Sequence, residues 1–375
     1  MAFCNRVSLF ASLFILCSVS VWGQADTLTP IVTFTEHPVG VERIYNIVFS
    51  PDGQYIASTG HSPGATTLVW RADNGEVIRR FESPEEMCSV CFTSAGKTFA
   101  GLRPNEDSVY LFEFPSFNEK GKLRVSMSES CTGWYSRIAV SQEAGRIAVD
   151  CGPWESKTIG FWDLASFEEI ERIDFSNVQL THLPVVGVTE IAFSPSGDRL
   201  LVGVKSVINA PSGSFMYPMA ILVDVPSLEV IAKYDDSGQD RQLGAPVAYS
   251  PDGSYYALLN QAAYRGRYNL LVFDDATLEL FNQFSVERGS FLSEGCLAFS
   301  PDGTKLLAGP SLCDVATGDL LRRFPIRVSH NAVAYSPDGN KVAISGAGKE
   351  RTTVTVWDVS DLNTSVADWA QRGGS

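Results

Sequence analysis

Short apolar segments alternate with polar turns along nearly the whole chain, and five of these segments share one pattern. In each, three or four apolar residues precede a Ser-Pro-Asp-Gly or Ser-Pro-Ser-Gly turn, and a second segment of alternating polar and apolar residues follows. β-Branched and aromatic residues in such segments favour strands. Strand units that recur every ~35–55 residues predict a radial or stacked repeat fold. The five copies begin at Asn46, Glu190, Pro246, Cys296 and Ala332, and two degraded copies begin at Ser89 and Arg137.

The turn at residues 50–53 shows why the pattern reverses the chain. Pro51 presets the backbone of the second turn position, Asp52 can bond to its own backbone, and Gly53 tolerates the positive φ needed to enter the next strand. A third strand follows, and another turn leads to a fourth, outer strand such as residues 76–81. We therefore predict an all-β fold, a seven-bladed β-propeller of four-stranded antiparallel blades within residues 26–375. The blades are expected to start near residues 44, 87, 135, 187, 245, 294 and 330.

The ends of the third strands carry a family resemblance. Two of them end in Trp-Asp, at residues 162–163 and 357–358, and three others keep only the Asp. On these residues the chain resembles the WD-repeat family of β-propellers, in a variant rich in Ser-Pro-Asp-Gly turns. The family's Gly-His pair before the first strand is mostly absent, although His37 and His330 stand near that position. The resemblance implies a ring closed across the termini, with residues 31–35 as the outer strand of the last blade.

The first 25 residues have the pattern of an export signal. Arg6 provides a short positive region, residues 7–22 are uncharged and mostly apolar, and small residues follow at 23–25. We expect a cleaved signal peptide (1–25) and a secreted or periplasmic protein, without membrane insertion after cleavage. The alternative is a membrane anchor formed by residues 7–22, which is slightly short for a full span.

Composition narrows the classes of partner. The chain has 375 residues, 45% of them hydrophobic and 19% charged, which is an ordinary globular balance. Its net charge of −14 argues against nucleic acid, because phosphate binding needs clustered Lys and Arg. We expect a monomer with a protein or peptide partner, and no cofactor.

Six cysteines remain after residue 25, an even number that permits disulfides in an oxidising compartment. Cys88 and Cys91 have the spacing of a redox or zinc pair. They fall in a strand of a repeat, however, where other copies carry apolar or small residues, and we interpret them as small buried hydrophobic residues. A bridge between Cys131 and Cys151 is left open. The six are Cys88, Cys91, Cys131, Cys151, Cys296 and Cys313.

Differences between the repeats point to a binding surface, because loops carry function. By the family resemblance, loops between second and third strands share one face, here called the top face, with the segments that link blades. The fourth blade carries a long insertion there, at residues 206–217, and the fifth carries residues 261–268. Aromatic and Arg residues dominate binding hot spots, although these rings could instead pack over the insertion. The candidate partner-binding residues are Trp134, Tyr135, Trp154, Phe215, Tyr217, Tyr264, Arg265, Arg267 and Tyr268.

No catalytic motif is visible: the chain lacks a nucleophile motif, a Gly-rich phosphate loop and a paired haem motif. His37, His61 and His330 would come from adjacent blades and are weak candidates for a metal site, although scattered histidines are the favoured interpretation. The leading hypothesis is an exported, non-enzymatic interaction scaffold. The alternatives are a lactonase-like or metal-dependent hydrolase that uses the central mouth of the top face, and a structural module of the cell surface.

Overall fold

The structure is a computed structural model that describes most of the chain between residues 28 and 363. Outside the described part lie residues 1–27, 39–40, 42, 62–65, 83–84, 94–95, 104–105, 126–136, 152–156, 181–182, 186, 211–212, 236–245, 261–266, 288–295, 327–331, 347–351 and 364–375. The predicted signal segment 1–25 is therefore outside it. In the described residues, no helix is both long enough and apolar enough to cross a membrane.

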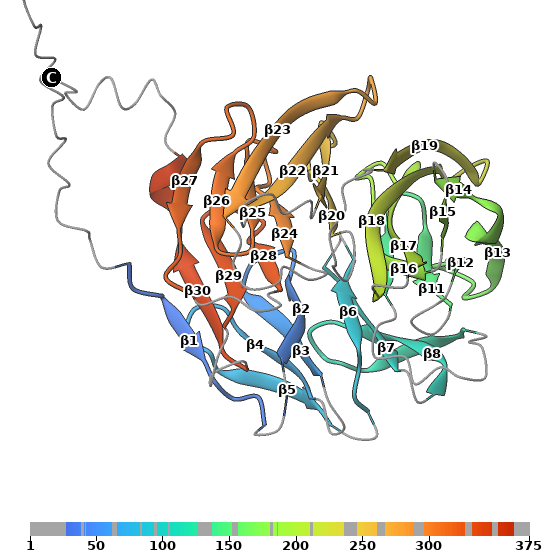
Figure 1. Cartoon of the computed structure of the whole chain (residues 1–375). Coiled ribbons are helices and arrows are strands. Elements are labelled where there is room, and N and C mark those ends of the chain that lie inside the picture. Colours follow the sequence, from blue (N-terminus) through green and yellow to red (C-terminus); the bar gives the residue numbers. More distant parts are fainter. Residues whose placement is uncertain are drawn as a thin grey trace, which may run out of the picture.

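The described strands form seven four-stranded antiparallel sheets, as predicted, and Figure 1 shows these blades following one another around a ring in chain order. Blade 1 contains β2 (Arg43–Phe49), β3 (Tyr55–His61), β4 (Thr67–Arg71) and β5 (Val77–Phe81). Blade 2 contains β6 (Ser89–Phe92), β7 (Thr98–Arg103), β8 (Ser108–Glu113) and β9 (Glu119–Arg124). Blade 3 contains β10 (Ile138–Ser141), β11 (Arg146–Asp150), β12 (Thr158–Asp163) and β13 (Glu169–Asp174).

The remaining four blades repeat this order. Blade 4 contains β16 (Gly187–Phe193), β17 (Arg199–Ala210), β18 (Gly213–Asp224) and β19 (Glu229–Asp235). Blade 5 contains β20 (Val247–Tyr249), β21 (Tyr255–Asn260), β22 (Arg267–Asp274) and β23 (Leu280–Glu287). Blade 6 contains β24 (Leu297–Phe299), β25 (Lys305–Ala308), β26 (Ser311–Asp314) and β27 (Leu320–Arg323). Blade 7 contains β28 (Val333–Tyr335), β29 (Lys341–Ser345), β30 (Val354–Asp358) and β1 (Val32–Phe34).

The N-terminal strand closes the ring, as the sequence predicts. β1 pairs antiparallel with β30, with Val32 opposite Val356 and Phe34 opposite Val354. The first strand of each blade contacts the first strands of both neighbouring blades, including β28 with β2, so the seven inner strands form an unbroken circle. Closure supplies the last blade with its outer strand and leaves β30 paired on both sides.

The hydrophobic core lies between adjacent blades. Ile159 of blade 3 and Val202 of blade 4 belong to one buried cluster, and Trp70 of blade 1 shares another with Val354 of blade 7. Each blade thus buries its two faces on its neighbours, which explains why near-continuous apolar runs occur in the second and third strands.

The Ser-Pro-Asp-Gly turns are held by their serine. The hydroxyl of Ser50 is fully buried; it donates to Asp52 Oδ1 and accepts a bond of 3.0 Å from the backbone N–H of Tyr55. Asp52 Oδ1 also accepts from the N–H of Gln54, and Gly53 has φ of 69°. The roles predicted for Asp and Gly are confirmed, while the structural role of the serine is evident only from the fold. Equivalent bonds occur at Ser194, Ser250, Ser300 and Ser336.

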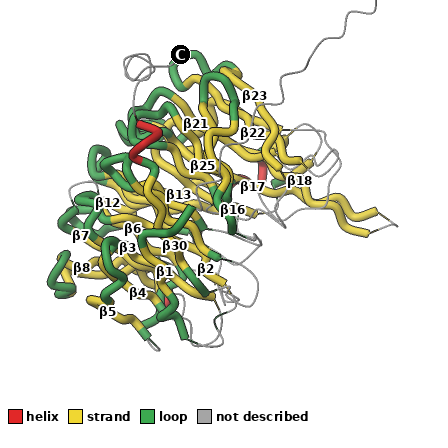
Figure 2. Tube along the Cα trace, turned by 90° about the vertical axis from the view of Figure 1, so that its left-hand side faces the viewer, coloured by secondary structure: helices red, strands yellow, loops and turns green. Residues whose placement is uncertain are grey.

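The blade 4 insertion is a strand extension rather than a loop. β17 and β18 have twelve residues each and stay in register to their ends, with Lys205 opposite Pro218 and Ala210 opposite Gly213. Figure 2 shows this hairpin extending beyond the other strands. Between blades 3 and 4 the chain adds a short 3₁₀ turn (Phe175–Asn177) and a two-stranded sheet of β14 (Gln179–Leu180) and β15 (Leu183–Pro184).

Candidate functional site

His37 belongs to a buried hydrogen-bond network. Its Nε2 atom lies 2.8 Å from the hydroxyl oxygen of Ser58, and the same oxygen accepts a bond of 3.1 Å from the indole N–H of Trp70. Burial, aided by the positive charge of Arg80, lowers the pKa of His37 to about 3. The imidazole is therefore neutral and occupied by a structural contact. His37 is one of the two histidines that stand near the position of the family's Gly-His pair, and it forms this network with β3 and β4 of blade 1.

The histidine group proposed as a weak metal candidate is not assembled in the described residues. His37 is 5% exposed and bonds to Ser58, while the side chain of His61 and the whole of His330 lie outside the described part. In that part, no three His, Cys, Asp or Glu residues are close enough together to hold a metal ion.

Most of the predicted contact residues also lie outside the described part of the chain. Tyr268 is an exception: its side chain is fully buried and belongs to the cluster between blades 5 and 6. It is a core residue, and we remove it from the proposed contact surface. The residues outside the described part are Trp134, Tyr135, Trp154, Tyr264 and Arg265, and the side chains of Phe215, Tyr217 and Arg267 are likewise not described, although their backbones lie in β18 and β22.

The described cysteines are free thiols, and four of the five are buried. Burial raises the pKa of Cys91 to about 12, which keeps the sulfur protonated and unreactive. Cys88 and Cys91 both contact the hydrophobic cluster around Leu102, which supports their interpretation as core residues. Cys151 forms no disulfide with a described residue, and Cys131 lies outside the described residues.

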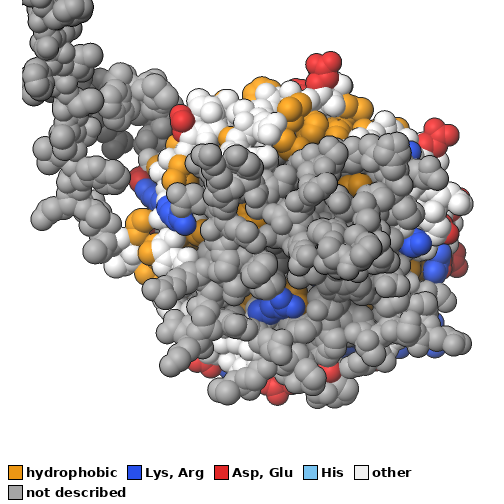
Figure 3. Space-filling model, in the orientation of Figure 1, with side chains coloured by type: hydrophobic (Ala, Val, Ile, Leu, Met, Phe, Trp, Pro, Cys, Tyr) orange, Lys and Arg blue, Asp and Glu red, His pale blue; other side chains and the backbone are white. Residues whose placement is uncertain are grey.

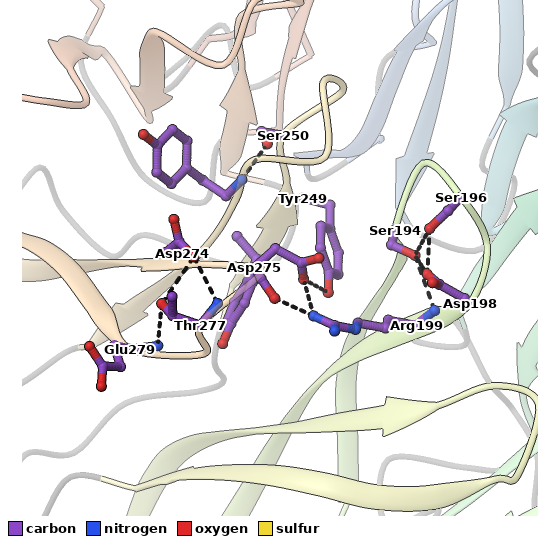
Figure 4. Close-up of polar contacts among 12 residues, drawn as sticks. Ser194, Ser196, Asp198, Arg199, Tyr249, Ser250, Asp274, Asp275, Thr277 and Glu279 are labelled. Carbon is purple, nitrogen blue, oxygen red and sulfur yellow. Dashed lines mark hydrogen bonds and ion pairs between the residues drawn. The ribbon is translucent and has the colours of Figure 1, made fainter.

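A polar cluster joins blades 4 and 5 on the face opposite the top face (Figure 4). Arg199 begins β17, and its guanidinium forms an ion pair of 2.9 Å with Asp275 Oδ1 in the turn after β22. The hydroxyl of Tyr249 donates to the same carboxylate at 2.8 Å. Burial raises the pKa of Tyr249, and the charge of Asp275 raises it further, so the hydroxyl stays a donor.

The sequence analysis did not single out Asp275. The contact of Arg199 with Asp275, called the clamp from here on, nevertheless has a counterpart in another repeat. Arg146 stands at the same turn position in blade 3 as Arg199 does in blade 4, five residues after the turn serine. Its guanidinium donates to the backbone oxygen of Val225, which is in the matching turn of the next blade. An arginine at this position therefore ties its blade to the following one.

An open cleft of about 380 Å³ lies on the same face, at the ends of the inner strands of blades 3, 4 and 5. Its walls include Val140, Phe193 and Tyr249, with Glu143 at the rim. The position before the turn serine or threonine is aromatic in the other six blades, so the smaller Val140 accounts for the space.

Comparisons with known proteins agree with this architecture. The family model described as "WD domain, G-beta repeat" matches residues 28–71, a segment that contains His37, Ser58 and Trp70. Centriole proteome protein 16 of Chlamydomonas reinhardtii is 28% identical over 179 residues, which are 45% of this chain and 8% of that protein. This chain therefore spans a small part of that relative.

Two solved structures share the fold at low sequence identity. Hydrazine synthase of Kuenenia stuttgartiensis superposes with a TM-score of 0.64 at 16% identity, over 87% of this chain and 98% of that one. The β-propeller domain of Cps50 (Swd1) from Myceliophteria thermophila gives 0.59 at 15% identity, over 87% and 99%. At such identities the likeness shows the fold alone. Together with the seven four-stranded blades, it establishes a β-propeller fold, and the matched repeat at residues 28–71 supports a propeller of the WD-repeat type.

Proposed function

We propose that this propeller is a non-enzymatic scaffold that binds a protein or peptide partner through its top face. The observation that carries the proposal is the hairpin of blade 4. Its two strands have twelve residues each, whereas the second and third strands of the other blades have four to eight. The extra residue pairs, from Ser206–Tyr217 to Ala210–Gly213, continue past the point where the neighbouring strand β19 ends its pairing at Met219.

Composition supports a contact role for this hairpin. Residues 206–217 include Val207, Ile208, Phe215, Met216 and Tyr217 and no charged residue. A two-stranded ribbon cannot bury apolar residues on both of its faces by itself. A partner that covers the ribbon would remove this apolar surface from water, at about 25 cal/mol per Å². Trp134, Tyr135, Trp154, Tyr264, Arg265 and Arg267 remain proposed contact residues of the same face.

Shortening the hairpin tests the proposal. Deletion of residues 206–209 and 214–217 removes four residues from each strand, so the alternation of faces and the turn at 210–213 are kept. We expect the shortened chain to keep the thermal unfolding midpoint of the full chain and to lose partner capture from native extract, measured by cross-linking and mass spectrometry. A Trp154→Ala and Tyr264→Ala variant probes the neighbouring loops. Unchanged capture by both variants would remove the top face as the binding surface.

Metal analysis of the purified protein separates the scaffold from the hydrolase alternative. A stoichiometric metal that is lost in His61→Ala would favour the enzyme. The Chlamydomonas relative is named as a centriole proteome protein, and a scaffold role is compatible with that name.

The proposed place of action is outside the cytosol. Arg6, the apolar residues 7–22 and the small residues at 23–25 support export with cleavage. Mass spectrometry of the protein from its native source tests this directly. A mature N-terminus between residues 24 and 26 is expected, and a chain that begins at Met1 would favour the anchored alternative or retention in the cell.

A further inference from the structure

The outer strands of the blades differ in one property that matters for edge pairing. An exposed sheet edge is a template for another strand, and proteins protect such edges with short strands, charged residues or proline. β5, β9, β13, β19 and β27 each carry at least two charged residues, and β1 has only three residues. β23 has eight residues, and its first seven, from Leu280 to Val286, are uncharged.

The start of β23 also exposes large apolar side chains. Leu280 is 49% exposed and Phe281 is 44% exposed. Figure 3 shows hydrophobic side chains gathered at the edge of the ring where Figure 1 places β22 and β23. Near their starts, the outer strands β5 and β13 each expose one large apolar residue, Ile78 and Ile170. Charged residues come directly after it in both strands. β27 exposes two leucines, and both of its other residues are arginines.

The outer edge of β23 has no neighbouring strand among the described residues. In that part of the chain β23 is the last strand of its sheet and pairs only with β22. The amide of Asn282 donates to the backbone oxygens of Val315 and Ala316 in blade 6, which fixes the strand against the next blade. Asn282 Oδ1 also accepts from the backbone N–H of Gln283.

A register shift does not explain the difference between the strands. β23 shows a shift against β22 between Val272 and Phe273, and such bulges can turn an edge away from pairing. The outer strands of blades 1 to 4 and 6 show a register shift at the same place, so the shift is common to these edges and to β23. What distinguishes β23 is its length and its lack of charge.

Charge decides between two possible occupants, a second copy of this chain and a segment of another protein. Acidic residues stand at both ends of β23, with the exposed Glu279 before it and Glu287 as its last residue. Two copies of a chain with net charge −14 repel one another, whereas a segment with basic ends is attracted.

We propose that β23 accepts an extended segment of a partner protein as a fifth strand of blade 5. The segment has an uncharged centre of alternating apolar residues, which meets residues 280–286. It has Lys or Arg at its ends, to complement the exposed Glu279 before the strand and the acidic last residue of the strand in the sequence. Main-chain hydrogen bonds supply the affinity and the alternate side chains supply the specificity. This surface is separate from the top face and does not depend on the proposed function.

A designed peptide tests the edge. The probe is the fluorescein-labelled peptide Lys-Lys-Val-Thr-Val-Thr-Val-Thr-Lys-Lys. Its binding to the whole chain from residue 26 is measured by fluorescence anisotropy. We expect saturable binding, and at least about tenfold weaker binding to Leu280→Lys with Gln283→Lys, because lysines give β23 the protection that the other edges have. The matched control, Ile170→Lys with Ile231→Lys, adds the same charge to edges that are already charged and is expected to bind as the unaltered chain does.

Two further measurements complete the test. A peptide with every central amide N-methylated is expected not to bind, because it lacks the donors for pairing, and amide hydrogen exchange of residues 280–286 is expected to slow in the complex. The chain with the shortened blade 4 hairpin should bind the probe normally. Absence of saturable binding, or equal binding by both lysine variants, would overturn the proposal. So would a concentration-dependent dimer that the β23 variant abolishes, since the occupant would then be a second copy.

Discussion

The Nε2 atom of His37 lies 2.8 Å from the hydroxyl oxygen of Ser58, and this contact joins the closing strand to the first blade. His37 follows β1, which belongs to blade 7, whereas Ser58 lies on β3 of blade 1. Trp70 donates to the same hydroxyl, and its ring stacks on Phe34 of β1 with centroids 4.2 Å apart. Ring closure therefore rests on buried polar and aromatic contacts as well as on the pairing of β1 with β30.

This relationship predicts a pH dependence of stability. Burial holds the pKa of His37 at about 3 in the folded chain, while an unfolded histidine titrates near ~6.5. Below that pH the unfolded state binds a proton that the folded state does not. The stabilisation is therefore complete above about pH 6.5, and it falls by about 1.4 kcal/mol per pH unit as the pH drops from about 6.5 towards about 3.

Urea unfolding at pH 7 and pH 5 measures this contribution. His37→Gln cannot titrate, so its free energy of unfolding should fall by about 2 kcal/mol less between these pH values than that of the unaltered chain. Equal losses in the two proteins would show that His37 is not held neutral by the fold.

The turn serines are predicted to contribute separately to stability. Ser300 is 1% exposed; its hydroxyl accepts from the N–H of Lys305 at 2.9 Å and donates to Asp302 at 2.6 Å. Burial alone would raise the pKa of Asp302, but hydrogen bonds from Ser300 and Thr304 bring it below its usual value. We expect Ser300→Ala to lower the free energy of unfolding by about 1–2 kcal/mol, because a buried N–H loses its partner.

Thr93 offers a matched control, since it occupies the same turn position in blade 2. Its hydroxyl oxygen is buried and has no hydrogen-bond partner in the described part of the chain. Thr93→Val should therefore leave the denaturant midpoint nearly unchanged or raise it. A loss as large as that of Ser300→Ala would mean that the hydroxyl bonds are not the cause.

The clamp between blades 4 and 5 is predicted to couple Arg199 to Asp275 energetically. Their side chains are 25% and 20% exposed, so the pair is only partly screened by solvent. We expect Asp275→Ala to cost about 1–3 kcal/mol, since Arg199 and Tyr249 both lose a partner. A double-mutant cycle with Arg199→Ala should give a coupling of about 1 kcal/mol.

Asp274 is the control for this cycle. Its carboxylate bonds to Thr277 within its own turn, so Asp274→Ala should show no coupling to Arg199→Ala in the same urea measurements. Equal coupling at both aspartates would argue for a general electrostatic effect.

The buried thiols are predicted to resist alkylation in the native state. Burial raises the pKa of Cys151 to about 12 and of Cys313 to about 11, so little thiolate exists at pH 8. Peptide mapping after iodoacetamide treatment should find Cys151 and Cys313 unmodified in the folded chain and modified in urea. A disulfide-linked peptide that contains either of them would contradict the structure.

The repeat and its strands could be predicted because their causes are local. Alternating apolar residues, a Pro that presets a turn and a Gly with positive φ act on neighbouring residues, so residues 50–53 predict their own turn. The closing strand could also be predicted, because residues 31–35 carry strand character before the first full repeat and the family resemblance implies a ring closed across the termini.

Contacts between blades could not be predicted in the same way. Arg199 and Asp275 are 76 residues apart and meet only because two blades pack face to face. Likewise, Tyr268 is of a residue type that is common in binding hot spots, yet its ring is buried between blades 5 and 6.

The sequence by itself determined the seven-fold repeat and the turn chemistry, and the family resemblance added the way the ring closes. The tertiary structure decided that residues 206–217 extend a hairpin, that His37 bonds to Ser58, and that β23 is left as an uncharged edge. The physical reason is that strand and turn formation depends on adjacent residues, whereas burial and pairing depend on which surface a neighbouring blade presents.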